Sequence, residues 1–277
     1  SCTLGAFLLK RLLSGIASKR AVSMKRDLLS FSWPLIISGY LWMVITWTDT
    51  MVIGFFWPAK DVGIYNAALT TAGVLIIVIE AFNFIFMPVI SELYGKGKRR
   101  EIVQVHRSVT KWIFMINLSL FLVMVLFPDN VLGVLFGKEF VAASAALVVL
   151  ATGYMIRIPG SLIGSALLSK GSTKVNIQLM MIAAIGALTN LVLNIMLIPQ
   201  IGITGAAVSS AISFTIMMCI RSYLGRKYLG LTIIDASYIK AMVAGGISVS
   251  VFYIMTVSYT HLRAHETSLH LVCRLLL

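Results

Sequence analysis

Lysine and arginine residues gather in four segments of this chain, and long apolar stretches separate the segments. Of the 23 such residues, 18 lie in Ser1–Arg26, Gly95–Lys111, Ser169–Lys174 and Arg221–Lys240. The apolar stretches are Leu29–Phe56, Ile64–Leu93, Val109–Phe127, Ala142–Leu168, Val175–Ile198, Ile203–Ile220 and Tyr238–Thr256. A hydrocarbon layer about 30 Å thick needs about 20 helical residues to cross it. The pattern predicts a polytopic membrane protein in which six stretches span the bilayer and the seventh is marginal.

The placement of the basic segments also predicts the orientation. If each stretch crosses once, all four basic segments lie on one side of the membrane, and the short loops on the other side carry only Lys60 and Lys138. The positive-inside rule places the basic side in the cytoplasm. We therefore expect a multi-pass protein of the cell membrane with cytoplasmic basic loops.

Composition excludes several other classes of protein. The chain is 59% hydrophobic and 12% charged, with a mean hydropathy of +0.95, which leaves too little polar surface for a water-soluble domain of this size. The net charge of +13 is spread over membrane-flanking loops, and no basic face with interleaved aromatic residues indicates nucleic-acid binding. The cysteines have no paired spacing, so no metal site is expected.

The sequences at both ends of the chain differ in character from the apolar middle. Residues 1–28 resemble the end of a preceding helix followed by a basic cytoplasmic linker, so we expect the chain to begin inside a longer protein. Residues 29–256 form the expected transmembrane unit. Residues 257–277 begin VSYTHLRAHE, which matches the translation of a transposon-type sequencing adapter. We expect this last segment to be an artefact and leave it out of the functional interpretation.

Three ionisable residues, Asp49, Glu80 and Arg157, fall inside the predicted spans. Charged groups at membrane depth are costly and usually face a bundle interior, a partner or a wet cavity. One interpretation is a structural ion pair or triad that holds helices together. The other is functional: Arg157 contacts an anionic group of a substrate, while Asp49 or Glu80 binds a coupling cation. The sequence does not separate the two.

Arg157 lies two residues before a helix-breaking pair, in the run Arg157–Ile158–Pro159–Gly160. Pro159 removes a backbone donor and disfavours helix at the residue before it, and Gly160 adds flexibility. Broken helices at membrane depth often mark binding sites or hinges in transporters. We therefore expect a kink or opening here, with Pro159 and Gly160 as a hinge. A static kink filled by a neighbouring helix is the alternative.

Two asparagines and a tryptophan complete the set of candidate site residues. Asn190 and Asn194 are four residues apart, so both project from one helix face. Such amides usually hydrogen-bond to neighbouring helices, and contact with a substrate is the second possibility. Trp47 lies deep enough to line a transport path, as does Trp42. We expect no catalytic residues and no cofactor.

Four runs, taken in order, resemble a known family. They are LLSFSWPLIISGYLWMVITWTDTMVIG at 28–54, VGIYNAA at 62–68, FGKEF at 136–140 and NLVLNIMLIPQIGITGAA at 190–207. Together they are similar to the polysaccharide biosynthesis or oligosaccharide flippase family, within the superfamily of multidrug, oligosaccharidyl-lipid and polysaccharide exporters. The resemblance covers about residues 28–256. It implies an all-α bundle that forms the second six-helix lobe of a MATE-like transporter, plus a truncated extra helix.

The resemblance also implies a function and partners. Members of the family move polyprenyl-pyrophosphate-linked oligosaccharide from the cytoplasmic to the outer leaflet by alternating access, without a covalent step. Expected partners are this lipid-linked substrate, membrane lipids and an N-terminal lobe of the same chain. A cation-coupled multidrug antiporter of the same superfamily is the first alternative, because acidic residues are present at depth. A membrane-embedded glycosyltransferase or polymerase is the second, although it would need larger outer loops than this chain has.

Overall fold

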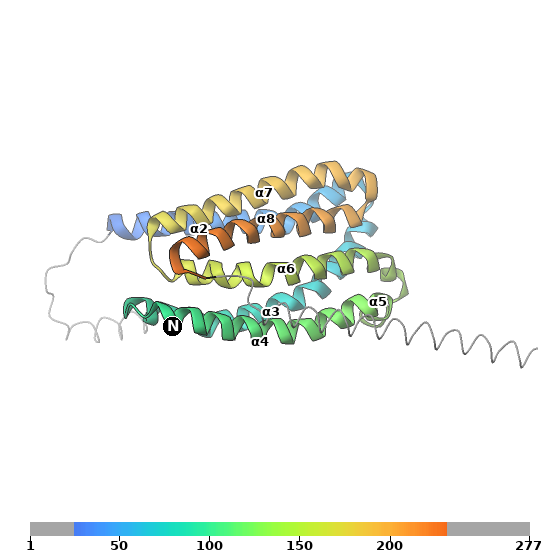
Figure 1. Ribbon diagram of the computed structural model, residues 1–277. Coiled ribbons are helices and arrows are strands. Elements are labelled where there is room, and N and C mark those ends of the chain that lie inside the picture. The colour runs from blue at the N-terminus through green and yellow to red at the C-terminus, as the bar shows by residue number, and fades with distance from the viewer. Residues whose placement is uncertain (1–24, 232–277) are drawn as a thin grey trace, which may run out of the picture.

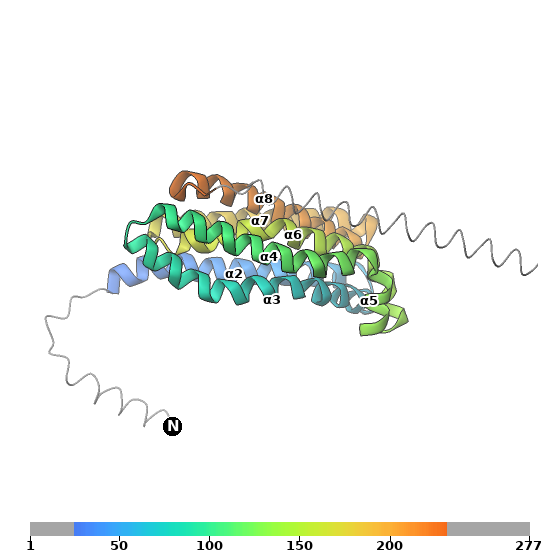
Figure 2. The same ribbon diagram turned by 60° about the horizontal axis from the view of Figure 1, so that its bottom comes forward.

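The computed structural model describes residues 25–231 and shows a bundle of helices (Figure 1). In chain order these are α2 (Lys25–Phe56), α3 (Ala59–Gly95), α4 (Arg99–Leu126), α5 (Pro128–Leu135), the 3-10 helix η1 (Lys138–Ala143), α6 (Ser144–Leu168), α7 (Thr173–Ile201) and α8 (Ile203–Leu229). Figure 2 shows from a second direction that the long helices run side by side. The described part of the chain is an all-α polytopic bundle, as the sequence predicts.

Six helices are long and apolar enough to cross a membrane: α2, α3, α4, the continuous η1–α6 segment, α7 and α8. Each contains one of the first six apolar stretches identified in the sequence, except that Phe127 of the third stretch follows the end of α4 at Leu126. The helices extend beyond those stretches, and α4 begins at Arg99, ten residues before the predicted start at Val109. The expected seventh span, Tyr238–Thr256, lies outside the described residues, as do residues 1–24 and 257–277.

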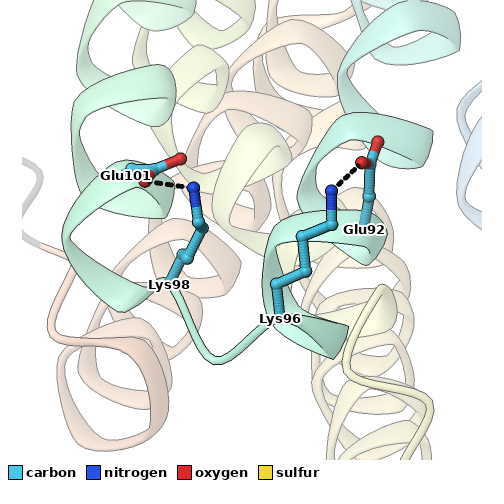
Figure 3. A network of polar contacts seen from close by, with 4 residues as sticks. All are labelled: Glu92, Lys96, Lys98 and Glu101. Atoms are coloured by element: carbon cyan, nitrogen blue, oxygen red, sulfur yellow. Dashed lines mark hydrogen bonds and ion pairs between the residues drawn. The ribbon is translucent and has the colours of Figure 1, made fainter.

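The described parts of the basic segments lie at one end of the bundle. In Figure 1 the start of α2, the turn between α3 and α4, the loop between α6 and α7, and the end of α8 all lie at the left. At the α3–α4 turn, Lys96 pairs with Glu92 and Lys98 pairs with Glu101 at 2.8 Å (Figure 3). The hydrogen bond to the Glu92 carboxylate raises the pKa of Lys96 above its ordinary value. This turn is therefore charged and exposed, as expected outside hydrocarbon.

Helices α6 and α8 run parallel and approach closely at glycines. A Cβ atom on Gly153 would lie 2.9 Å from the Cα of Ala211, and one on Gly160 would lie 3.0 Å from the Cα of Met218. Small residues at these positions let the two backbones come together, which is how membrane helices gain packing energy. Helix α6 thus forms the centre of the bundle.

Helix α6 continues unbroken through Pro159. The opening predicted around Arg157–Gly160 is thus absent from this conformation. The buried Pro159 and Gly160 pack inside the bundle, and Gly160 provides the close approach to α8. Their role as a hinge stays a prediction.

Candidate functional site

Asp49 is the centre of a buried polar network. Its side chain is 2% exposed and lies on α2. Tyr65 and Ser210 each donate a hydrogen bond of 2.6 Å to Oδ2, and the amides of Asn190 and Asn194 donate to Oδ1 at 3.0 and 2.7 Å. The donors come from α3, α7 and α8, so the carboxylate joins four helices. The four neutral donors satisfy the oxygens of this buried carboxylate.

Asn190 and Asn194 lie behind this carboxylate. Both are 0% exposed, and neither lines the cavity described below. Asn190 also donates to Ser210 Oγ at 3.1 Å, and Asn194 donates to Asn190 Oδ1 at 3.2 Å. In this conformation they pack and position Asp49, which is the first of the two interpretations given for them. The contact with substrate stays a prediction.

Arg157 is held by aromatic rings. Its guanidinium carbon lies 4.1 Å from the ring centroid of Trp42 and 5.4 Å from that of Phe214. Phe214 in turn stacks between Trp42 and Tyr154, with centroid distances of 6.1 and 5.4 Å. Cation–π contact of this kind fixes a guanidinium without neutralising its charge.

Arg157 also lacks a counter-ion among the described residues. No carboxylate oxygen of residues 25–231 lies within 4.0 Å of its nitrogens. Its Nε and Nη1 are buried and have no hydrogen-bond acceptor. The predicted structural ion pair with Asp49 or Glu80 is therefore not formed in this conformation. A buried cation with unmet donors is costly unless something else supplies an acceptor.

The three ionisable residues of the predicted spans all line one cavity of about 340 Å³. Its wall contains Asp49, Glu80 and Arg157, together with residues of α2, α3, α6 and α8: Trp42, Ile45, Thr46, Leu69, Ile76, Tyr154, Ser210 and Phe214. Glu80 and Thr46 are exposed, so the cavity reaches the surface of the bundle between α2 and α3. Its volume lies at the lower end of the range for ligand pockets, about 300–1,000 Å³.

Helices α2 and α3 are joined near their connecting turn and leave this space between them farther along. Near their connecting turn the two helices are joined by the bond from Tyr65 to Asp49 and by one from Thr50 to Asn66 at 3.3 Å. Farther along, Trp42 and Glu80 face the same cavity from opposite helices. The helices therefore meet at the less basic end and separate toward the basic end, with α6 and α8 as the floor.

Trp47 does not join this site. Its side chain is 53% exposed and is absent from the cavity wall, which contains Trp42 instead. The two positions are five residues apart, so they point about 140° apart around a helix of 3.6 residues per turn. The substrate contact predicted for Trp47 is thus not supported by this geometry.

Several residues of the cavity wall and of the Asp49 network were not recognised as site residues from the sequence. Tyr65, Tyr154 and Phe214 carried no signal beyond aromatic character inside a span. Ser210 belongs to a run of small residues that is typical of close helix packing. Trp42 lies seven residues before Asp49, which puts both on one helix face, and this spacing was the available signal. A metal site was not expected, and residues 25–231 contain no group of three His, Cys, Asp or Glu that could hold one.

Comparison with known proteins places the fold and the cavity in context. Residues 3–94 match the family described as polysaccharide biosynthesis protein. The probable low-salt glycan biosynthesis flippase Agl15 of Haloferax volcanii is 28% identical over 69% of this chain and 40% of its own length. By these matches the chain is similar to the polysaccharide biosynthesis family. The matched family region contains α2 and α3, which form two walls of the cavity.

Two further proteins are similar to this chain. The capsular polysaccharide biosynthesis protein CapF of Staphylococcus aureus is 24% identical over 68% of this chain and 47% of its own length. An outward-facing multidrug resistance MATE family transporter of the MOP superfamily has a TM-score of 0.57 at 17% identity, over 76% of this chain and 47% of that one. The chain therefore has a MATE-like fold in its described residues. It spans less than half the length of each of these three proteins.

Proposed function

We propose that this chain supplies one wall of the translocation pathway in a flippase for lipid-linked oligosaccharide. The complete protein would carry polyprenyl-pyrophosphate-linked sugar from the cytoplasmic to the outer leaflet by alternating access. A second lobe of the same protein would supply the opposite wall, facing the gap between α2 and α3. The basic end of the bundle would lie in the cytoplasm, by the positive-inside rule, and the protein would reside in the cell membrane.

The observation that carries this proposal is the unpaired Arg157 on the wall of the large cavity. A pyrophosphate group pays a high desolvation cost inside hydrocarbon. A guanidinium offers it charge-assisted, bidentate hydrogen bonds in a site of low dielectric. Because no described carboxylate pairs with Arg157, its charge is available to an anionic cargo.

The other wall residues suit the sugar part of the cargo. The rings of Trp42, Phe214 and Tyr154 lie side by side along the cavity, and flat apolar faces of this kind pack against the C–H face of a sugar ring. Glu80 and Thr46, also on the wall, can accept hydrogen bonds from sugar hydroxyls. Binding needs no bond-making step, so the proposed activity is transport rather than catalysis. The flippase names of relatives support this reading.

A cation-coupled antiporter is the second candidate, because Asp49 and Glu80 also reach the cavity. A carboxylate beside a cavity can bind a proton or a sodium ion and so couple transport to a gradient. Asp49 already accepts four hydrogen bonds from neutral donors, which satisfies it without a cation in this conformation. This observation makes the antiporter the less favoured candidate.

Proteoliposomes that contain the complete protein separate the two candidates. A fluorescent polyprenyl-pyrophosphate oligosaccharide would be loaded in one leaflet, and a glycosidase on the other side would report its arrival. The proposal predicts arrival above that of protein-free liposomes. Accumulation of organic cations driven by a sodium or proton gradient, with no movement of the lipid-linked sugar, would support the antiporter and contradict the flippase.

A further inference from the structure

A second, much smaller cavity lies between α6 and α8, next to the large one. Its volume is about 10 Å³, and Arg157 and Phe214 belong to the walls of both cavities. On its other side is Arg221 of α8. A volume of this size holds about one water-sized particle. Two arginine side chains, together with Gly160, Met217 and Met218, therefore border a space for a single small particle.

The position of Arg221 is built by the packing of the two helices. Arg221 follows Phe214 by seven residues on α8, which is about two turns, so both lie on the same face toward α6. It lies over Gly164 of α6, where an added Cβ would stand 3.5 Å from the arginine Nε. The missing side chain at Gly164 leaves room for the guanidinium.

The two arginines share an unmet need for acceptors. Arg221 Nε is buried without a hydrogen-bond partner, as are Nε and Nη1 of Arg157. No carboxylate of residues 25–231 forms an ion pair with either side chain. Like charges that border one small cavity repel each other, and each enclosed N–H without an acceptor adds a cost. The rings of Trp42 and Phe214 attract the Arg157 cation but accept no hydrogen bond from the unmet N–H groups.

We propose that Arg157 and Arg221 form an anion site between α6 and α8 that binds one compact anion. Its size fits a chloride ion or a single oxygen of a phosphate group. Such a particle would accept hydrogen bonds from the three unmet donors and would screen the two positive charges from each other. The proposal rests on the two arginines alone and stands whether or not the transported cargo is a lipid-linked sugar.

An anion that enters from the basic end of the bundle would meet the two arginines of the site in a fixed order. Arg221 lies eight residues before the basic end of α8 at Leu229, or about 12 Å at about 1.5 Å per residue. Arg157 lies eleven residues before the end of the parallel helix α6, which is about 16 Å by the same measure. An anionic group that approaches from the basic end would therefore meet Arg221 first and Arg157 second.

Thermal unfolding of the complete protein in phosphatidylcholine nanodiscs tests the site. Sodium chloride, sodium phosphate or a polyprenyl monophosphate in the nanodisc would be titrated, with sodium gluconate holding ionic strength constant. We expect a saturable rise in Tm for the wild type. Arg157→Gln and Arg221→Gln should each weaken the apparent affinity about tenfold or more. Arg226→Gln removes the same charge from an exposed position on the same helix and should respond like the wild type.

The three additions distinguish the source of the anion. A response to chloride or inorganic phosphate without one to polyprenyl phosphate identifies a free inorganic ion, whereas a response to polyprenyl phosphate at concentrations where inorganic phosphate has no effect identifies a lipid headgroup. A wild-type response that Arg221→Gln leaves unchanged would overturn the proposal. So would a wild type that shows no saturable rise with any of the three.

A second measurement keeps the proposal testable if Arg221→Gln does not fold. Chloride-35 NMR on the wild-type protein in nanodiscs should show line broadening beyond that of empty nanodiscs, and inorganic phosphate should compete it away. Arg221→Lys keeps the charge but loses the planar fork of donors, so it should fold and bind more weakly. Broadening equal to that of empty nanodiscs, together with no saturable rise in Tm with phosphate or polyprenyl phosphate, would overturn the site. The sugar-transfer assay is independent, so a failed flippase is distinguishable from a failed anion site.

Discussion

The guanidinium carbon of Arg157 lies 4.1 Å from the ring centroid of Trp42, and this contact connects α6 with α2 across the floor of the large cavity. It holds the cation on the wall, because the ring attracts the charge without cancelling it. In a chain with two carboxylates on the same wall, the aromatic contact favours a guanidinium that stays unpaired until a ligand arrives.

Replacing the ring should therefore reduce transport. We expect Trp42→Leu to lower delivery of lipid-linked sugar by about threefold to thirtyfold, the equivalent of one cation–π contact, while Trp42→Phe retains part of the rate. Proteoliposome transfer rates measure this. Trp33→Leu, at an exposed position of the same helix, is the matched control. Equal rates for Trp42→Leu and the wild type would remove the role assigned to this ring.

The Asp49 network should contribute strongly to stability. Ser210→Ala removes one donor to the carboxylate, and Asp49→Ala leaves four buried donors without an acceptor. We expect Asp49→Ala to cost at least about 2 kcal/mol and Ser210→Ala about 1 kcal/mol of unfolding free energy. Denaturant unfolding in detergent micelles measures both.

Ser209 provides the control for this network. It is buried beside Ser210, but its hydroxyl donates to Gly205 O of its own helix. Ser209→Ala should therefore cost less than Ser210→Ala. The reverse order would show that the interhelical bonds to Asp49 are not the main stabilising contacts.

Close packing of α6 on α8 makes a third prediction. Gly153→Ala would place a methyl group 2.9 Å from Ala211 Cα, which is backbone and does not yield easily. We expect a loss of about 1–3 kcal/mol, the usual cost of overpacking, measured as a fall in the thermal unfolding midpoint. Gly73→Ala in α3, where no atom lies within 4 Å of the new methyl, should be neutral or slightly stabilising. Similar losses at both positions would contradict the packing argument.

The orientation of the bundle makes a fourth prediction. Single cysteines at Lys96 and Lys170 should react with a membrane-impermeant thiol reagent from the cytoplasmic side only, and one at Lys60 from the outside only. Cys219 is exposed, so the native cysteines need replacement first. Reaction of the Lys96 and Lys170 positions from opposite sides would overturn the topology and the direction of transport with it.

The six spans were predictable from the sequence because the thickness of hydrocarbon determines their length. The stretch Ile203–Ile220 needed no tertiary information to be assigned to α8, and the basic ends followed from the same pattern. The presence of Asp49, Glu80 and Arg157 at membrane depth was equally visible. That all three border one cavity was not, because their helices are neighbours only in the folded bundle.

The contacts within the site depend on helix packing that no local pattern encodes. Asn194 binds Asp49 across 145 residues of sequence, and the pairing requires α7 to lie beside α2. Trp42 and Trp47 point in different directions around α2. The position of α6 in the folded bundle determines which of them faces Arg157. Arg221 was assigned to a basic loop from the sequence, yet it lies within α8, over Gly164.

The most direct test of the central claim is the rate at which the complete protein delivers lipid-linked oligosaccharide when Arg157 is changed. We expect Arg157→Gln to lower the rate at least about tenfold, because a charge-assisted hydrogen bond to phosphate is lost. Arg157→Lys should be intermediate, and Arg226→Gln should match the wild type. An Arg157→Gln protein that inserts normally and delivers the sugar at the wild-type rate would contradict the account.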